Sequence, residues 1–183
     1  MNLHPNSFHH IYNRGINHQK IFFESENYSF LQAKFKREVA TFCSLLAYCL
    51  MPNHFHFLVL LPEDEKPFSK AFGHFLSSYT RAINRRYKRT GSLFQQNTKS
   101  KILEGEDAFV CFHYIHQNPV KAGLCDGFED WKYSSFNEYY AGEQNICETK
   151  VTRGLLDLPK TKEAFMEMSK GVVINEKVLD AIK

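Results

Sequence analysis

Two histidines separated by one residue mark the segment of this chain that is best suited to chemistry. The residues Asn53-His54-Phe55-His56 precede an apolar run at residues 57–61, a pattern typical of a β-strand. Because side chains alternate between the two faces of a strand, His54 and His56 should share a face, about 7 Å apart. Two imidazoles so placed can bind one metal ion, but a third ligand must come from elsewhere. A strand with two packed histidines is the simpler alternative.

A second candidate cluster lies about sixty residues later, in a segment with a helical pattern. Residues 104–118 begin with acidic side chains, which favour a helix N-terminus, and Pro119 is expected to end the helix. Tyr114 and Asn118 are four residues apart and therefore share one face of this helix. Asn118 could give a metal its carboxamide oxygen, and Tyr114 could present a phenol beside it. A phenol attacks slowly at neutral pH, so this chemistry needs a polarised target such as a metal-bound phosphate.

The order of the predicted elements is β-α-β-β-α-β-α. Strands are expected at residues 7–14, 41–51 and 54–61 and before Leu103, and helices at 24–39, 68–90 and 104–118. Pro52-Asn53 should join the second and third strands as a hairpin. Ser25 is expected to cap the first helix, and Gly91 to stop the second. Together these elements indicate an α+β, ferredoxin-like sandwich with a central antiparallel sheet, helices packed on it and a small C-terminal extension.

The helical segment 68–90 has an apolar face and a basic face. Its apolar positions recur at helical spacing and are expected in the core: Phe72, Phe75, Leu76, Tyr79, Ile83 and Tyr87. From Lys66 to Lys101 there are nine basic residues and no acidic one, although the whole chain has a net charge of only +3. A solvated surface is the ordinary explanation, whereas the one-sided charge favours nucleic-acid contact. The candidate phosphate contacts are Arg81, Arg85, Lys88, Arg89, Lys99 and Lys101, with Arg14 and Lys121 as weaker candidates.

The composition fits a single globular domain with a phenylalanine-rich core. The chain has 183 residues, of which 15% are aromatic and 17 are Phe. Its five cysteines show no C-x-x-C spacing and are expected to be reduced, buried thiols. The N-terminus lacks an apolar signal segment, and no apolar run reaches the roughly 18 residues needed to span a bilayer. We therefore expect a cytoplasmic protein without membrane contact.

Taken together, the two motifs resemble those of a known family. The segment 51–56 (MPNHFH) is similar to the His-hydrophobic-His signature of HUH nucleases. The segment 114–123 (YIHQNPVKAG) resembles the tyrosine helix of the single-tyrosine transposases of insertion sequences, most of all their REP-associated branch. The segments 10–15 (HIYNRG) and 91–95 (GSLFQ) also resemble that branch. The resemblance covers about residues 7–142, so we expect a transposase (nuclease) domain at residues 1–142 and an accessory segment at 143–183.

The resemblance implies roles for individual residues. Tyr114 would be the nucleophile, and His54, His56 and Asn118 would hold Mg²⁺ or Mn²⁺. Members of the family cut single-stranded DNA, often beside a hairpin, and form a 5′-phosphotyrosine and a free 3′-hydroxyl. Because the adduct keeps the bond energy, rejoining to another strand needs no nucleotide cofactor. The implied partner is single-stranded DNA with hairpin structure, and a homodimer is compatible with this activity.

Two other functions stay open from the sequence. The same ferredoxin-like scaffold serves as a nucleic-acid-binding module without chemistry, although such modules present aromatic residues rather than histidines on the central strands. A Zn²⁺ hydrolase could use His54, His56 and either His113 or His116. That enzyme would also need a general base, and no residue of the sequence stands out for this role.

Overall fold

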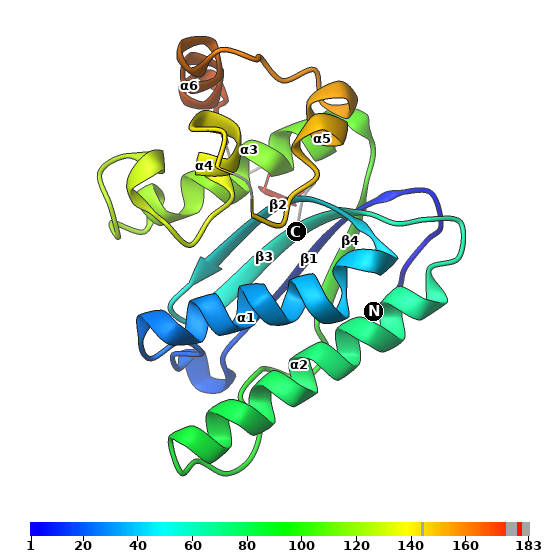
Figure 1. Cartoon of the computed structure of the whole chain (residues 1–183), viewed down its shortest axis with the longest axis vertical. Helices are drawn as coiled ribbons and strands as arrows, with labels where there is room; N and C mark the ends of the chain where they lie inside the picture. Colours follow the sequence, from blue (N-terminus) through cyan, green and yellow to red (C-terminus); the bar gives the residue numbers. More distant parts are fainter. Residues whose placement is uncertain (144, 175–178, 181–183) are drawn as a thin grey trace.

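The fold is built on one four-stranded antiparallel sheet (Figure 1). The computed structural model describes residues 1–143, 145–174 and 179–180. The spatial order is β2-β3-β1-β4, and the strands are β1 (Phe8–Arg14), β2 (Ser44–Met51), β3 (His54–Leu60) and β4 (Lys99–Leu103). This order, with one helix after β1 and one after β3, is that of a ferredoxin-like sandwich. The predicted fold class is therefore confirmed.

Helices cover both faces of the sheet (Figure 1). One face packs against α1 (Ser25–Glu38) and α2 (Lys66–Arg86). The other face packs against α3 (Gly105–Lys121), and beyond it lie α4 (Phe136–Tyr140), α5 (Thr149–Leu155) and α6 (Lys162–Gly171). Short 3₁₀ turns occur at Ile16–His18, Ala40–Phe42 and Phe128–Asp130. The sheet thus separates two hydrophobic cores.

The alternation of side chains along β3 decides which core each residue joins. Phe55 and Phe57 belong to the core under α1 and α2, where the predicted aromatic face of α2 is also buried. Tyr87, which was predicted in that face, caps the helix and is half-buried. Leu58 belongs to the core under α3. His54 and His56 alternate in step with Leu58, so they share one face of the strand, as predicted, and this is the face that α3 covers.

Two helix ends differ from the sequence prediction. Glu24, not Ser25, is the N-cap of α1, because Glu24 and Asn27 form a reciprocal capping box. The second helix ends at Arg86 and not at residue 90, because Lys88 takes a left-handed backbone with φ of 51°. The N–H of Arg89 then bonds to a carbonyl in the last turn of α2, as in a Schellman motif. The helix has therefore already ended before it reaches Gly91.

The prediction that Pro119 ends the tyrosine helix was wrong, because α3 continues to Lys121. A proline in a helix costs most in the interior, where it removes a hydrogen bond and crowds the preceding turn. Here the chain leaves the helix within three residues of Pro119, and the N–H of Ala122 still bonds to the carbonyl of Asn118 at 2.9 Å. Asn118 therefore sits in ordinary helical backbone.

The segment after Gly142 packs against α3 rather than standing apart. Phe165 of α6 is fully buried among the rings of Phe112, Phe136 and Tyr139. The side chain of Gln117 donates to the carbonyls of residues 169 and 172, at 3.0 and 2.8 Å. The helix predicted near residues 162–168 is confirmed, and the one predicted at 176–182 falls largely outside the described residues. The domain boundary after residue 142 stays a prediction.

The outer edge of β2 is covered by the segment 131–135. The N–H of Leu50 donates to the carbonyl of Tyr133, and the N–H of Ser135 donates to the carbonyl of Tyr48, both at 2.9 Å.

All five cysteines are free thiols, and three of them are buried. No helix in the described part of the chain is long and apolar enough to cross a bilayer.

The stability of the fold should fall on acidification because of a buried histidine in α3. His113 is fully buried, and this burial lowers its pKa from 6.5 to about 4. Between those values the unfolded chain binds a proton that the folded chain excludes, so stability is lost as the pH falls, at about 1.4 kcal/mol per pH unit. We expect the free energy of unfolding, measured with urea, to fall between pH 7 and pH 5 in both wild type and the variant His113→Phe. The fall should be about 2 kcal/mol larger in wild type than in His113→Phe. Equal pH dependence in wild type and His113→Phe would contradict the prediction.

Candidate active site

The register of the sheet gathers polar side chains on the face that α3 covers. β1 pairs Arg14 with His54 and Tyr12 with His56 on one side, and Tyr12 with Lys99 on the other. Residues directly opposite one another in an antiparallel pair point to the same face. These five side chains therefore lie in adjacent rows at one end of the sheet. Towards the other end the same face becomes apolar and packs against α3.

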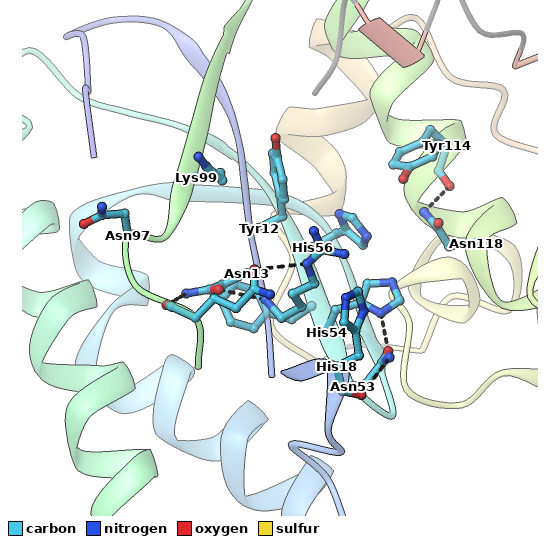
Figure 2. Close-up of a pocket in the computed structure, with 13 residues that line it drawn as sticks. Tyr12, Asn13, His18, Asn53, His54, His56, Asn97, Lys99, Tyr114 and Asn118 are labelled. Carbon is cyan, nitrogen blue, oxygen red and sulfur yellow. Dashed lines mark hydrogen bonds between the residues drawn. The ribbon is translucent and has the colours of Figure 1, made fainter. Parts of the chain in front are cut away.

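These polar rows border an open pocket of about 530 Å³ (Figure 2). Its lining comes from four parts of the chain: Tyr12, Asn13, Arg14 and His18; Asn53, His54, Phe55 and His56; Gln95, Asn97 and Lys99; and Tyr114 and Asn118. The predicted histidine pair and the predicted tyrosine-asparagine pair thus line one pocket. They come from β3 and α3, which are far apart in sequence.

In each of the two histidines of β3, one ring nitrogen is engaged in a hydrogen bond. Their ring centroids lie 5.1 Å apart, close enough for both rings to reach one cation. His54 Nδ1 lies 2.6 Å from Asn53 Oδ1, which can only accept, so this nitrogen carries the proton. His56 Nδ1 lies 2.9 Å from His10 Nε2. In both rings Nε2 is therefore the nitrogen that could bind a metal.

Tyr114 packs directly on one of these histidines. Its ring meets His56 edge to face, with centroids 5.5 Å apart. Burial raises the pKa of Tyr114 to about 12, while Asn118 acts in the opposite direction. The Asn118 amide nitrogen donates to the carbonyl of Tyr114 at 2.8 Å, so its Oδ1 is the atom that could bind a metal. A phenol with this pKa is protonated at neutral pH and needs a polarised target.

The donor set suits a loosely bound divalent cation. Two imidazole nitrogens and one carboxamide oxygen leave coordination positions open for substrate oxygens. Among the described residues, no group of three or more His, Cys, Asp or Glu is placed to hold a metal, and Asn118 is the predicted oxygen ligand that lines the same pocket as the two histidines. Imidazole nitrogens are ligands typical of Zn²⁺, Cu²⁺ and Fe²⁺, whereas a carboxamide oxygen is a ligand of the kind that Mg²⁺ and Mn²⁺ bind.

His113 and His116 do not line the pocket. Both are buried on the side of α3 that faces α4 and α6. His116 Nε2 lies 2.7 Å from the hydroxyl of Ser135, and burial lowers the pKa of His116 well below its usual value. The structure therefore places neither His113 nor His116 where the zinc-hydrolase alternative would need its third ligand.

The predicted phosphate contacts fall into two groups. Arg14 and Lys99 line the pocket, and Lys101 pairs with His10 one row further along the same face. The others lie away from the pocket lining: Arg81, Arg85 and Lys88 are exposed on α2 and the turn after it, Lys121 is exposed at the end of α3, and Arg89 is half-buried. Arg89 donates to the side chains of Asn84 and Gln19, which makes it partly structural.

The sequence prediction missed the wall of the pocket opposite α3. The side chain of Asn13 donates to the carbonyl of Gln95 and to the hydroxyl of Thr98, at 3.2 and 3.0 Å. Arg14 Nε donates to Gln95 Oε1 at 3.0 Å, so the loop before β4 is fastened to the end of β1. These hydrogen bonds join residues that are about eighty positions apart, so no local pattern in the sequence reveals them. The strand alternation in residues 8–14 could have placed His10 beside Tyr12.

Comparisons with known proteins agree with this fold. Residues 6–118 match the family model described as IS200-like transposase. Over 102 residues the chain is 28% identical to a putative REP-associated tyrosine transposase of Haemophilus influenzae, covering 50% of this chain and 58% of that protein. The chain thus matches little more than half the length of this relative.

A solved structure of a REP-associated tyrosine transposase bound to a REP hairpin has the same fold. The TM-score is 0.64 at 21% identity, and the match covers 80% of this chain and 87% of the other. The family model extends over more than half of the chain, from the start of β1 to Asn118 in α3. The chain therefore belongs to the IS200-like transposase family.

Proposed function

We propose that this protein cuts and rejoins single-stranded DNA beside a hairpin, with Tyr114 as the nucleophile. The observation that carries the proposal is the contact of Tyr114 with His56 in one pocket that His54 and Asn118 also line. Membership of a transposase family supports DNA transposition as the setting, and the hairpin held by the similar structure supports hairpin-bearing DNA as the substrate. A DNA-binding module without chemistry would need no such arrangement.

The proposed reaction exchanges one phosphodiester bond for another. The Tyr114 oxygen forms a bond to the scissile phosphorus while the bond from phosphorus to the 3′ oxygen breaks. The phenol gives up its proton and the departing 3′ oxygen takes one up, so the products are a 5′-phosphotyrosine and a 3′-hydroxyl. Attack by a 3′-hydroxyl on the adduct reverses these changes and rejoins the DNA without a nucleotide cofactor.

His54, His56 and Asn118 would hold Mg²⁺ or Mn²⁺ at the pocket. When bound, the cation would polarise the scissile phosphate and offset the charge that develops on it. The protein's own part is positioning: β3 fixes the imidazoles, and packing against His56 holds the phenol in place. Arg14 and Lys99 at the pocket would bind the phosphates on either side of the cleavage point.

The first test concerns the nucleophile. Tyr114→Phe should bind a hairpin-bearing oligonucleotide as wild type does but form no covalent adduct in Mn²⁺, because only the attacking oxygen is lost. The measurement is a denaturing gel for the adduct, followed by peptide mapping of the modified residue. Tyr12 lines the same pocket and provides the control, since Tyr12→Phe should still form the adduct. Mapping of the DNA to Tyr12 or to any tyrosine other than Tyr114 would falsify the assignment.

The second test concerns the metal. His54→Ala and His56→Ala should each abolish cleavage while the circular dichroism spectrum stays that of a folded protein, and EDTA should inhibit the wild type. His18 also lines the pocket but lies outside β3, so His18→Ala should keep metal-dependent cleavage. Full wild-type activity in excess chelator would contradict a metal-dependent reaction. Tight Zn²⁺ binding with no cleavage in Mg²⁺ or Mn²⁺ would contradict the proposed cation.

The third test concerns three exposed basic residues of α2 and of the turn after it: Arg81, Arg85 and Lys88. They are called the basic face of α2 below. If these residues track a DNA backbone, replacing all three by Gln should weaken binding most at low salt. Each lost contact should reduce the salt slope by about 0.7 on a single strand. Base preference should change little, because phosphate contacts carry no sequence information. The measurement is binding across a salt series, with Tyr114→Phe present to prevent cleavage.

Lysines of the C-terminal segment provide the matched control. Lys160, Lys162 and Lys170 lie in or beside α6, at the opposite end of the molecule from α2 (Figure 1). Changing these three to Gln removes the same charge and should leave the slope unchanged. Equal slopes for the two triple variants would show that the basic face of α2 does not contact DNA.

A further inference from the structure

We propose that His10 is a positioning residue that holds His56 in its metal-binding form and orients the Tyr114 ring. This inference rests on the proposed function, because it assigns His56 as a ligand and Tyr114 as the nucleophile. It concerns a residue of β1 that neither of the two motifs contains.

His10 lies between β3 and α3 and contacts the reactive groups of both. It is fully buried, and it is not among the residues that line the pocket. Its Nε2 lies 2.9 Å from His56 Nδ1, and the two rings stack with centroids 5.1 Å apart. The edge contact with Tyr114 has a centroid distance of 5.9 Å. The ring of Tyr12, which lines the pocket, also lies against His10, with centroids 4.8 Å apart. His10 can therefore act on substrate only indirectly, through neighbours such as His56, Tyr114 and Tyr12.

The contact between the two histidines decides which tautomer of His56 is compatible with a bound metal. A neutral imidazole has one N–H, and the nitrogen that binds a metal must be the other one. Because His56 Nδ1 faces His10, the metal can bind only at His56 Nε2, and the proton must then sit on Nδ1. His10 Nε2 accepts that proton's hydrogen bond, so His10 carries its own proton on Nδ1.

Asn53 plays the same part for the other ligand, because His54 Nδ1 donates to Asn53 Oδ1. Each imidazole of the pair thus has its own acceptor, as metal-binding histidines generally do. With an apolar side chain at residue 10, the Nδ1–H of His56 would lose the hydrogen bond that His10 accepts, and losing a buried hydrogen bond is costly. His56 would then favour the tautomer with its proton on Nε2, which is the form that cannot bind a metal at that atom.

The test compares two variants at residue 10 with a control on the same strand. His10→Leu removes the acceptor, whereas His10→Gln can keep an acceptor oxygen near the position of Nε2. His9 is the control, because it is equally buried but bonds to Ser100 and Ser7, away from the pocket. The probe is Mn²⁺ alone, titrated with protein and followed by the electron paramagnetic resonance signal of the free ion. His10→Leu should weaken Mn²⁺ binding about 10- to 100-fold, and His10→Gln and His9→Leu should stay near wild type.

A second measurement reads the proton position without metal or DNA. In protein labelled with ¹⁵N in its imidazoles, two-bond nitrogen-proton spectra should show wild-type His56 protonated on Nδ1. In His10→Leu the same resonance should report protonation on Nε2. This shift is one that a merely structural loss at residue 10 would not produce.

Three outcomes would overturn the inference: wild-type His56 protonated on Nε2, wild-type Mn²⁺ affinity in His10→Leu, or equal weakening in His10→Leu and His9→Leu. The first of these needs no variant, so a His10→Leu protein that fails to fold leaves the test decisive. The proposed function fails separately, if wild type forms no adduct on Tyr114. The inference alone fails if wild type forms that adduct while the His56 proton sits on Nε2.

Discussion

The antiparallel pairing of β1 with β3 sets the positions of the two histidines and of the β1 side chains beside them. In this register Arg14 lies opposite His54, and Tyr12 lies opposite His56. A shift of one residue would turn each side chain to the other face and place the phenylalanines of β3 under α3. The two cores oppose such a shift, because Phe55 and Phe57 fill one and Leu58, on the other face of the same strand, belongs to the other. The packing of the whole sandwich therefore holds the histidines in place.

The same constraint explains why the tyrosine helix can be far away in sequence and still reach the pocket. α3 packs its apolar side chains on the apolar end of the sheet face, and this packing carries Tyr114 over the polar end. Gln117, one turn after Tyr114, bonds to the carbonyls of residues 169 and 172 at the end of α6. The helix that carries Tyr114 is thus held both by the sheet and by the C-terminal segment. The placement of Tyr114 depends on both sets of contacts.

The fold and the two motifs could be predicted from the sequence because their signals are periodic or local. The two-residue period of β3 put His54 and His56 on one face, and the four-residue spacing put Tyr114 beside Asn118. The features that could not be predicted from the sequence are those that tertiary contacts set. The role of His10 depends on the neighbouring strand, and the loop before β4 is held by Asn13, about eighty residues away. The helix α2 ends where Lys88 takes a left-handed backbone conformation, which sequence rules expect of glycine and not of lysine.

The two edges of the sheet limit how copies of this protein can join. Backbone groups on the outer edge of β2 already bond to the segment 131–135, so a strand from a second copy has no place to pair there. The other outer edge is β4, which carries Lys99 and Lys101, so a second copy pairing there would bring positive charges close together. Like charges placed opposite one another disfavour such pairing. Growth of the sheet from molecule to molecule, which is the usual route from an open sheet to aggregates, is therefore blocked on one side and repelled on the other.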